Sequence, residues 1–227
     1  RLETAWGEAD GCDVLGLGYA TPWLGAFVGA RRLIAAMPSG QGVEAWPRGA
    51  RNRSVLVDDR ALPFAAGSFD RVLVVHALEE ADDVAALMAE AIRVLTPAGR
   101  IILVAAARGG LWARAESTPF GHGRPFTRRQ LEKLVREVGL EPAAWSQTLY
   151  VPPWPALYGM ADGVEQVGRR VVPGAAGLIL LEATRHAYAR VQPVGATERV
   201  PLRGAALQPS PAGRGASRAL AQPGEHA

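Results

Sequence analysis

The fold is decided near the start of the chain by the stretch CDVLGLGYATP, which covers Cys12–Pro22. The apolar run Asp13–Leu17 predicts a strand, and the next segment predicts a helix with Thr21 as N-cap and Pro22 at its first position. The small residues between them are Gly16, Gly18 and Ala20. Small residues allow a tight turn, a helix close to its strand and a ligand close to the backbone. A turn without a ligand would use the same residues, so this signal is weak by itself.

Downstream of this turn, short apolar runs alternate with segments of helical period, which predicts a doubly wound α/β sheet. Further strands are expected at 32–36, 54–57, 71–75, 101–105, 143–150 and 178–184. Helices are expected at 21–30, 82–96, 127–139 and 154–171, and the Gly- and Pro-rich segment 38–53 is expected to be a loop.

The end of the chain has a different composition. Residues 191–227 are mostly Ala, Gly, Pro, Ser and Arg without periodicity, so they cannot bury enough apolar surface to offset their ordering entropy. We therefore expect one domain over residues 1–190 and a disordered tail over 191–227.

Composition narrows the class of protein. The single cysteine, Cys12, excludes an intramolecular disulfide and favours the cytoplasm, and we expect it to be a small buried side chain. No secretory signal and no apolar run of spanning length is present in the sequence, so no membrane partner is expected. The net charge is only +3, of which the tail carries +2 from four arginines and two glutamates, and this gives nucleic-acid binding little support.

Three later segments resemble the class I S-adenosylmethionine-dependent methyltransferases, in particular the small-molecule type-11 group. They are DDRALPF at Asp58–Phe64, GSFDRV at Gly67–Val72 and RVLTPAGR at Arg93–Arg100. With the first turn, their order and spacing match that family from Asp13 to about Leu140. The resemblance implies a Rossmann-like, mostly parallel sheet of seven strands, S-adenosyl-L-methionine as cofactor, and methyl transfer to a small molecule.

The resemblance also implies roles for individual residues. The cofactor would contact Gly16, Gly18, Ala20, Asp58, Leu62 and His76. Asp58 would accept a hydrogen bond from the adenine amino group, and Leu62 with Pro63 would follow the adenine. His76 would lie beside the sulfonium and the substrate, and it is the best general-base candidate, although it could equally shape the pocket without moving a proton.

Two later segments hold candidate substrate-binding residues. His122 and Arg124 lie in the loop after the fifth expected strand, 101–105. Tyr150 and Trp154 lie in an aromatic, proline-rich segment further along the chain. The alternatives are a surface connection for the first segment and a core plug or partner-binding patch for the second.

An acidic cluster begins the helix expected at 82–96. It consists of Glu79, Glu80, Asp82 and Asp83. We interpret it as capping and helix-dipole stabilisation on a solvated face, and we expect no metal site because only His76 is near in sequence.

The sequence departs from the family at two acidic positions. Val14 stands two residues before the first glycine, and the second expected strand runs into Met37 and Pro38 without a carboxylate before Glu44. A catalytically inactive binding or regulatory protein of the same fold therefore remains an alternative, and a nicotinamide-dependent oxidoreductase is disfavoured by the Leu-Pro-Phe and Ser-Phe-Asp segments. No Asn-Pro-Pro-aromatic motif follows the fourth strand, which argues against adenine methylation in nucleic acids.

Overall fold

The computed structural model describes residues 9–110, 112–114, 123–151, 170 and 175–185. Its strands are β1 (Asp13–Gly18), β2 (Arg32–Pro38), β3 (Ser54–Val57), β4 (Phe69–Val75), β5 (Leu95–Ala106), β6 (Leu140–Thr148) and β7 (Leu178–Arg185). Its helices are α2 (Thr21–Leu24), α3 (Val84–Val94) and α4 (Arg128–Glu137), with a 3-10 turn, η1, at Trp112–Arg114. No helix in these described parts is long and apolar enough to cross a membrane.

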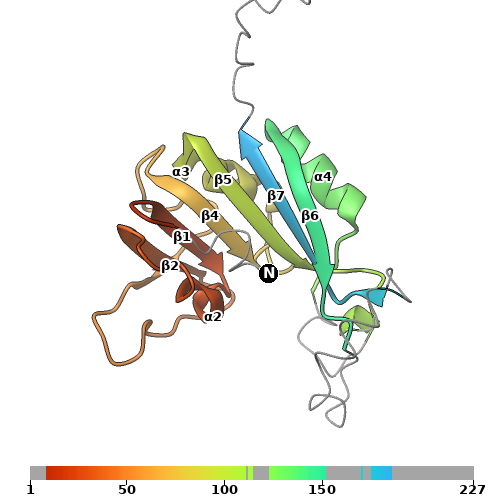
Figure 1. Cartoon of the computed structure of the whole chain (residues 1–227), viewed down its shortest axis with the longest axis horizontal. Coiled ribbons are helices and arrows are strands. Elements are labelled where there is room, and N and C mark those ends of the chain that lie inside the picture. The colour runs from red at the N-terminus through yellow and green to blue at the C-terminus, as the bar shows by residue number, and fades with distance from the viewer. Residues whose placement is uncertain (1–8, 111, 115–122, 152–169, 171–174, 186–227) are drawn as a thin grey trace, which may run out of the picture. The chain divides into compact units, whose positions relative to one another are not determined.

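The seven strands form one sheet in the order β3-β2-β1-β4-β5-β7-β6 (Figure 1). Neighbouring strands from β3 to β5 are parallel, and β7 runs antiparallel to both β5 and β6. The expected doubly wound, mostly parallel, seven-stranded sheet is thereby confirmed. From β1 the chain moves outward to β2 and β3 and then returns to β4, so the strand order reverses between β1 and β4. Open α/β sheets bind ligands at the carboxyl ends of the strands at such a reversal.

Apolar side chains cover both faces of the sheet. On one face α3 and α4 bury Leu87, Met88 and Leu131 against the central strands. On the other face α2 buries Leu24, and Phe27 packs with it. Figure 1 shows α3 and α4 on the same side of the sheet, with α2 on the opposite side.

The two longer helices begin at the signals that the sequence contains. The Asp83 side chain accepts a hydrogen bond from the Ala86 N–H at 3.0 Å and caps α3. Thr127 and Gln130 form the expected capping box at the start of α4. Each cap satisfies N–H groups that have no partner inside the helix.

The first helix is much shorter than expected. It ends at Leu24, with Gly25 as its C-cap, rather than near Ala30, and Gly29 with a φ of +80° could not belong to a right-handed helix. Thr21 was also the wrong N-cap: the cap residue is Ala20, which makes no side-chain cap bond, and Pro22 lies in the first turn as expected. The Thr21 hydroxyl instead donates to Glu44.

Two strand boundaries also differ from the expectation. β5 begins at Leu95 directly after α3, so Pro97 and Gly99 lie within the strand and do not end the helix. Its first part pairs with β4 through Phe69 and Leu95, before an irregularity in register. β6 begins at Leu140 rather than near residue 143, since Leu140 is buried and pairs with β7. The expected helix at 154–171 falls almost entirely outside the described residues, as does the tail at 191–227, and both stay predictions.

Candidate functional site

Three adjoining cavities follow the carboxyl ends of β3, β2, β1 and β4. We name them, by one lining residue each, the Asp58, His76 and Glu44 cavities, and their volumes are about 400, 380 and 320 Å³. Gln41, from the loop after β2, lines all three. Gly40 lines the first two cavities and Tyr19 lines the last two. The cavities therefore form one track at the place where the strand order reverses.

The turn after β1 brings backbone to this track. Gly18 lines the Glu44 cavity and has a φ of +82°, and a Cβ there would lie 2.3 Å from the Val75 carbonyl oxygen. Only glycine fits this backbone and this contact. Gly16 has a packing role, because its Cβ would lie 2.7 Å from the Cβ of the buried Ala20. Gly16 and Ala20 were expected at the cofactor, but neither lines one of the three cavities.

Two carboxylates after β3 face the Asp58 cavity. Asp58 accepts from the Arg60 backbone N–H at 2.9 Å, and this bond, with the Arg60 guanidinium, lowers the pKa of the Asp58 carboxyl. Burial, with the neighbouring Asp58 charge, raises the pKa of Asp59. Both residues line the cavity, so it offers charged acceptors for the N–H groups of a ligand.

The Leu-Pro-Phe segment is held by α3 rather than opening onto the track. Leu62 is buried in the core, and its N–H donates to the Glu90 carboxylate at 2.7 Å. Arg93 donates to the carbonyl oxygens of Leu62 and Phe64 at 2.9 and 2.8 Å and pairs with Glu90 at 2.7 Å. Leu62 was expected at the adenine; it does not line the three cavities, and its contact with the adenine stays a prediction.

His76 follows β4 and lines the His76 cavity with Glu79, Glu80 and Gly123. Its φ of 51° is left-handed, a conformation that histidine adopts more readily than most residues. Its ring Nδ1 lies 2.8 Å from Glu79 Oε1. Glu79 is only 7% exposed, so the expectation of a wholly solvated acidic cluster was wrong.

Glu44 reaches back from the loop after β2 to the end of β1. Its Oε1 accepts from the Thr21 hydroxyl at 2.9 Å, and its N–H contacts Met37 Sδ at 3.2 Å. Val14 and Met37, which stand at the two acidic positions of the family, are buried apolar side chains. Glu44 therefore brings a carboxylate to the track where β2 itself has none.

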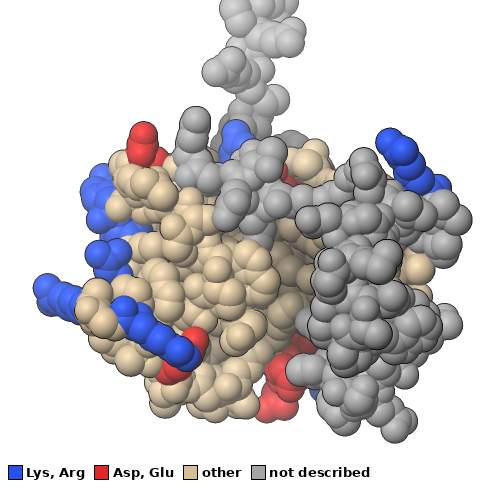
Figure 2. Space-filling view, turned by 60° about the horizontal axis from the view of Figure 1, so that its bottom comes forward, with Lys and Arg blue, Asp and Glu red and all other residues tan. Residues whose placement is uncertain are grey.

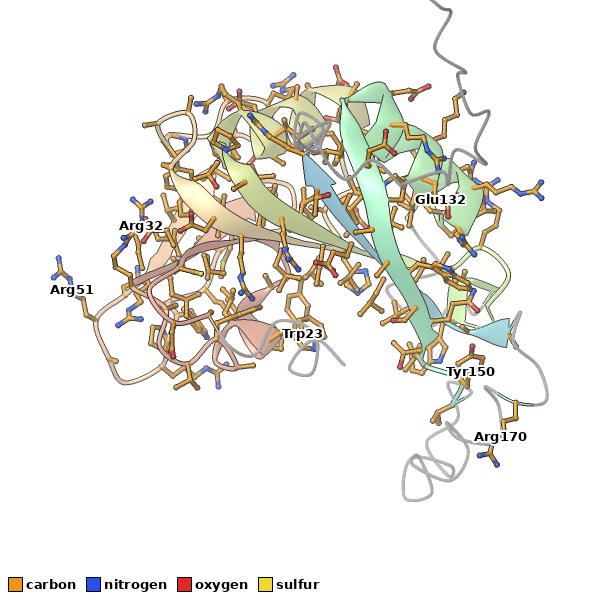
Figure 3. The ribbon with its side chains drawn as sticks, turned by 45° about the horizontal axis from the view of Figure 1, so that its top comes forward. Trp23, Arg32, Arg51, Glu132, Tyr150 and Arg170 are labelled. Atoms are coloured by element: carbon orange, nitrogen blue, oxygen red, sulfur yellow. The ribbon has the colours of Figure 1, made fainter. Side chains whose placement is uncertain are left out.

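The expected substrate-binding residues are not gathered at this track. The Arg124 side chain is exposed and does not line the three cavities, although its backbone N–H donates to the Glu79 carbonyl at 3.2 Å. Tyr150 is buried, donates to Gln147 at 3.4 Å and follows the edge strand β6; Figure 3 shows it to the right of Trp23, below the end of β6. His122 and Trp154 lie outside the described residues.

Sequence reasoning missed Gln41, Tyr19 and Gly123, whose only signal is their place in loops after strands. Figure 2 turns the carboxyl edge of the sheet forward and shows a described surface that is mostly tan, with small groups of acidic side chains along its lower edge and basic side chains mainly toward the left margin. Among the described residues no three His, Cys, Asp or Glu side chains are grouped as metal ligands would be.

The chain resembles a methyltransferase family model and several solved structures of methyltransferases. A family model described as "Methyltransferase domain" matches residues 12–103. A Thermotoga maritima S-adenosylmethionine-dependent methyltransferase, described as a possible histamine N-methyltransferase, is 21% identical, with a TM-score of 0.55 over 77% of this chain and 82% of its own. A geranyl diphosphate methyltransferase solved with S-adenosylmethionine is 16% identical, with a TM-score of 0.56 over 81% and 82% of the two chains.

The same fold also occurs in a protein with a different named activity. The [4+2]-cyclase SpnF is 19% identical, with a TM-score of 0.55 over 82% of this chain and 80% of its own. A search of curated protein sequences gave no match. The domain match over residues 12–103 and the strand order nevertheless confirm the resemblance to the fold of class I S-adenosylmethionine-dependent methyltransferases.

Proposed function

We propose that this protein is a methyltransferase that transfers the methyl group of S-adenosylmethionine to a small molecule. The observation that carries the proposal is the single track of three cavities that meet at Gln41. A cofactor made of adenine, a sugar and an amino acid is long and polar, and it needs a track with acceptors at several points. The site lies where the strand order reverses, as expected for such a ligand.

The residues along the track fit this cofactor. Asp58 and Asp59 offer acceptors to the adenine amino group, and Glu44, with Thr21, offers an acceptor to the sugar hydroxyls. The absence of a side chain at Gly18 lets the amino-acid part of the cofactor approach the backbone closely. The bound cofactor supplies an electrophilic methyl group on a positively charged sulfur, and the chain contributes alignment of the acceptor with that group.

The His76 cavity is the proposed acceptor site, with His76 as the catalytic residue. At about 380 Å³ it has the size of a small-molecule site. Gly123 lines it, and neighbouring Arg124 comes from the same loop, which keeps this loop as the proposed source of substrate contacts. None of the described residues that line it is Lys or Arg, so they do not form the basic surface that a nucleic acid would need.

The alternative is an inactive protein of the same fold that binds a ligand and regulates a partner. The buried apolar residues Val14 and Met37 favour it, since the family has carboxylates at these positions. The position of Glu44 beside Thr21 supports the enzyme, because this carboxylate can replace the one that β2 lacks.

Calorimetric titration of the full chain separates these functions. We expect S-adenosylhomocysteine to bind at one site and NAD not to bind. Asp58→Ala should weaken the affinity about ten-fold through the loss of a charged acceptor, with Glu137→Gln on the exposed side of α4 as the matched control. No binding of S-adenosylhomocysteine at millimolar concentration would overturn the proposal. Binding without transfer of labelled methyl to any acceptor would instead favour the inactive protein.

A further inference from the structure

A buried carboxylate and a histidine form a pair beside the proposed acceptor site. Glu79 Oε1 accepts from the Ala106 backbone N–H at 2.7 Å and lies 2.8 Å from His76 Nδ1. The side chains of Glu79 and His76 are 6% and 15% exposed, and both residues line the same cavity. The pair therefore lies at the inner end of a cavity and not on the surface.

Three other segments of the chain hold the pair in place: β5, the loop that carries Gln41 and the loop that carries Gly123. The His76 N–H donates to Val104 at 3.0 Å, and its carbonyl accepts from Gln41 Nε2 at 2.6 Å. The Glu79 carbonyl accepts a hydrogen bond from the Arg124 backbone N–H. A Cβ added at the neighbouring Gly123 would lie 2.8 Å from the Glu79 Cβ. These contacts fix the left-handed backbone at His76, a conformation that persists only where the surroundings determine it.

The hydrogen bonds determine which ring nitrogen carries the proton. With Glu79 as a carboxylate, which can only accept hydrogen bonds, His76 Nδ1 is the donor to Glu79 Oε1. A neutral imidazole with its proton on Nδ1 has its lone pair on Nε2. A carboxylate that orients a histidine in this way also stabilises the imidazolium that forms when the ring takes a proton.

The second carboxylate oxygen indicates that Glu79 is more than a packing residue. Within the described residues, Glu79 Oε2 is buried and has no hydrogen-bond partner. A buried polar atom without a partner destabilises a fold, and such atoms in native proteins call for an explanation. An apolar side chain would fill the same space without this cost.

We propose, as an extension of the proposed function, that Glu79 is a positioning residue that holds His76 as a general base, and that the acceptor is an uncharged hydroxyl group. His76 Nε2 takes the hydroxyl proton while the acceptor oxygen forms its bond to the methyl carbon. The methyl–sulfur bond breaks, and its electron pair stays on sulfur, which loses its positive charge. The proton ends on His76, next to the Glu79 carboxylate.

The lining of the cavity selects this acceptor class. Glu79 and Glu80 both line it, so an acceptor that is already an anion, such as a carboxylate or phosphate, is repelled. An uncharged hydroxyl is a weak nucleophile until it loses its proton, and it therefore gains most from a base. A neutral amine, unlike a hydroxyl, already carries a reactive lone pair on nitrogen and gains less from a base.

The tautomer of His76 tests the positioning role without any turnover. The chain has four histidines, so nitrogen-15 labelling of histidine with a His76→Gln variant assigns the signals of His76. We expect the wild type to carry the ring proton on Nδ1. Glu79→Ala should move it to Nε2, which free histidine favours, and Glu80→Ala should leave it in place. A wild-type proton on Nε2, or an unchanged tautomer in Glu79→Ala, overturns the proposal.

Labelled methyl transfer tests the acceptor class. The full chain is incubated with methyl-labelled S-adenosylmethionine and a small-molecule extract of the source cells, and the labelled product is identified by mass spectrometry. We expect the label on oxygen and a roughly 100-fold lower rate in Glu79→Ala, with S-adenosylhomocysteine affinity unchanged. Label on nitrogen, sulfur or carbon, or no labelled product despite binding, overturns this inference. If the wild type does not bind S-adenosylhomocysteine, the proposed function itself is overturned.

Discussion

The Glu44 carboxylate is placed by contacts rather than by a regular element. Its side chain is about half exposed, yet Oε1 accepts from Thr21 and the residue lines the cavity next to Gly18. Arg48, four residues further along the same loop, lies 3.8 Å from the other carboxylate oxygen and is almost fully exposed. A weak surface pair of this kind leaves the carboxylate available to a ligand.

We predict that Glu44→Gln weakens binding of S-adenosylhomocysteine about ten-fold while the melting temperature stays within experimental error. The substitution removes the charge at nearly constant shape, so the loss reports the interaction with the ligand rather than packing. Isothermal titration calorimetry gives the affinity, and Arg48→Ala is the control because it removes only the exposed partner. Unchanged affinity in Glu44→Gln would show that backbone or water contacts hold the sugar hydroxyls.

At the scale of elements, α3 fixes the segment that follows β3. Glu90 and Arg93 leave the same face of the helix and together bind the backbone of Leu62 and Phe64. This segment carries Asp58 and Asp59 to the cavity, so α3 determines where these carboxylates lie. The hydrogen bond from Arg93 lowers the pKa of the Glu90 carboxyl, against the opposing effect of burial.

The pKa of Glu90 leads to a pH-dependent prediction for Glu90→Gln. A pKa that folding lowers contributes stability above the unfolded value, near 4.5, and this stability disappears as pH falls through the folded value. At pH 7 we expect a loss of about 1 kcal/mol, or about 2 to 4 °C in melting temperature, since the partly exposed Arg93 is screened by solvent. The difference from wild type should shrink as the pH falls below 4.5.

Thermal unfolding followed by circular dichroism at several pH values measures this effect. Glu137→Gln is the matched control, because Glu137 pairs with Lys133 on the exposed surface of α4 and such pairs contribute little. A loss in Glu90→Gln that persists undiminished at pH 3 would contradict the proposed origin of the effect.

The sequence predicts the elements whose signals are local. Asp83 and Thr127 cap their helices through residues three positions away, and the apolar runs of β1, β4 and β7 are apparent in the sequence. The burial of Glu79 could not be predicted in this way, because the Glu79 carboxylate contacts the Ala106 N–H, 27 residues further along the chain. The same holds for Gln41, whose partner is the His76 carbonyl. Contacts between distant loops carry no periodicity that a sequence alone reveals.

At the scale of the whole domain, the fold provides the site but not the reaction. The reversal of strand order between β1 and β4 places the loops after β1, β2, β3 and β4 beside one another. The same sheet serves named methyltransferases and a named cyclase among the similar structures, so the choice of reaction must come from side chains in those loops. In this chain those loops carry the His76–Glu79 pair, Gln41 and Glu44.

The domain boundary leads to a prediction for the tail. Every described core residue lies between Ala9 and Ala183, and the sequence after Arg190 is poor in large apolar residues. We predict that deletion of residues 192–227 leaves the melting temperature and the affinity for S-adenosylhomocysteine unchanged, because no core side chain is removed. The control is a deletion that begins at Leu178, which removes β7 from between β5 and β6 and should abolish cooperative unfolding. A drop of several degrees in the shorter deletion would show that the tail packs on the domain and that the boundary lies further along the chain.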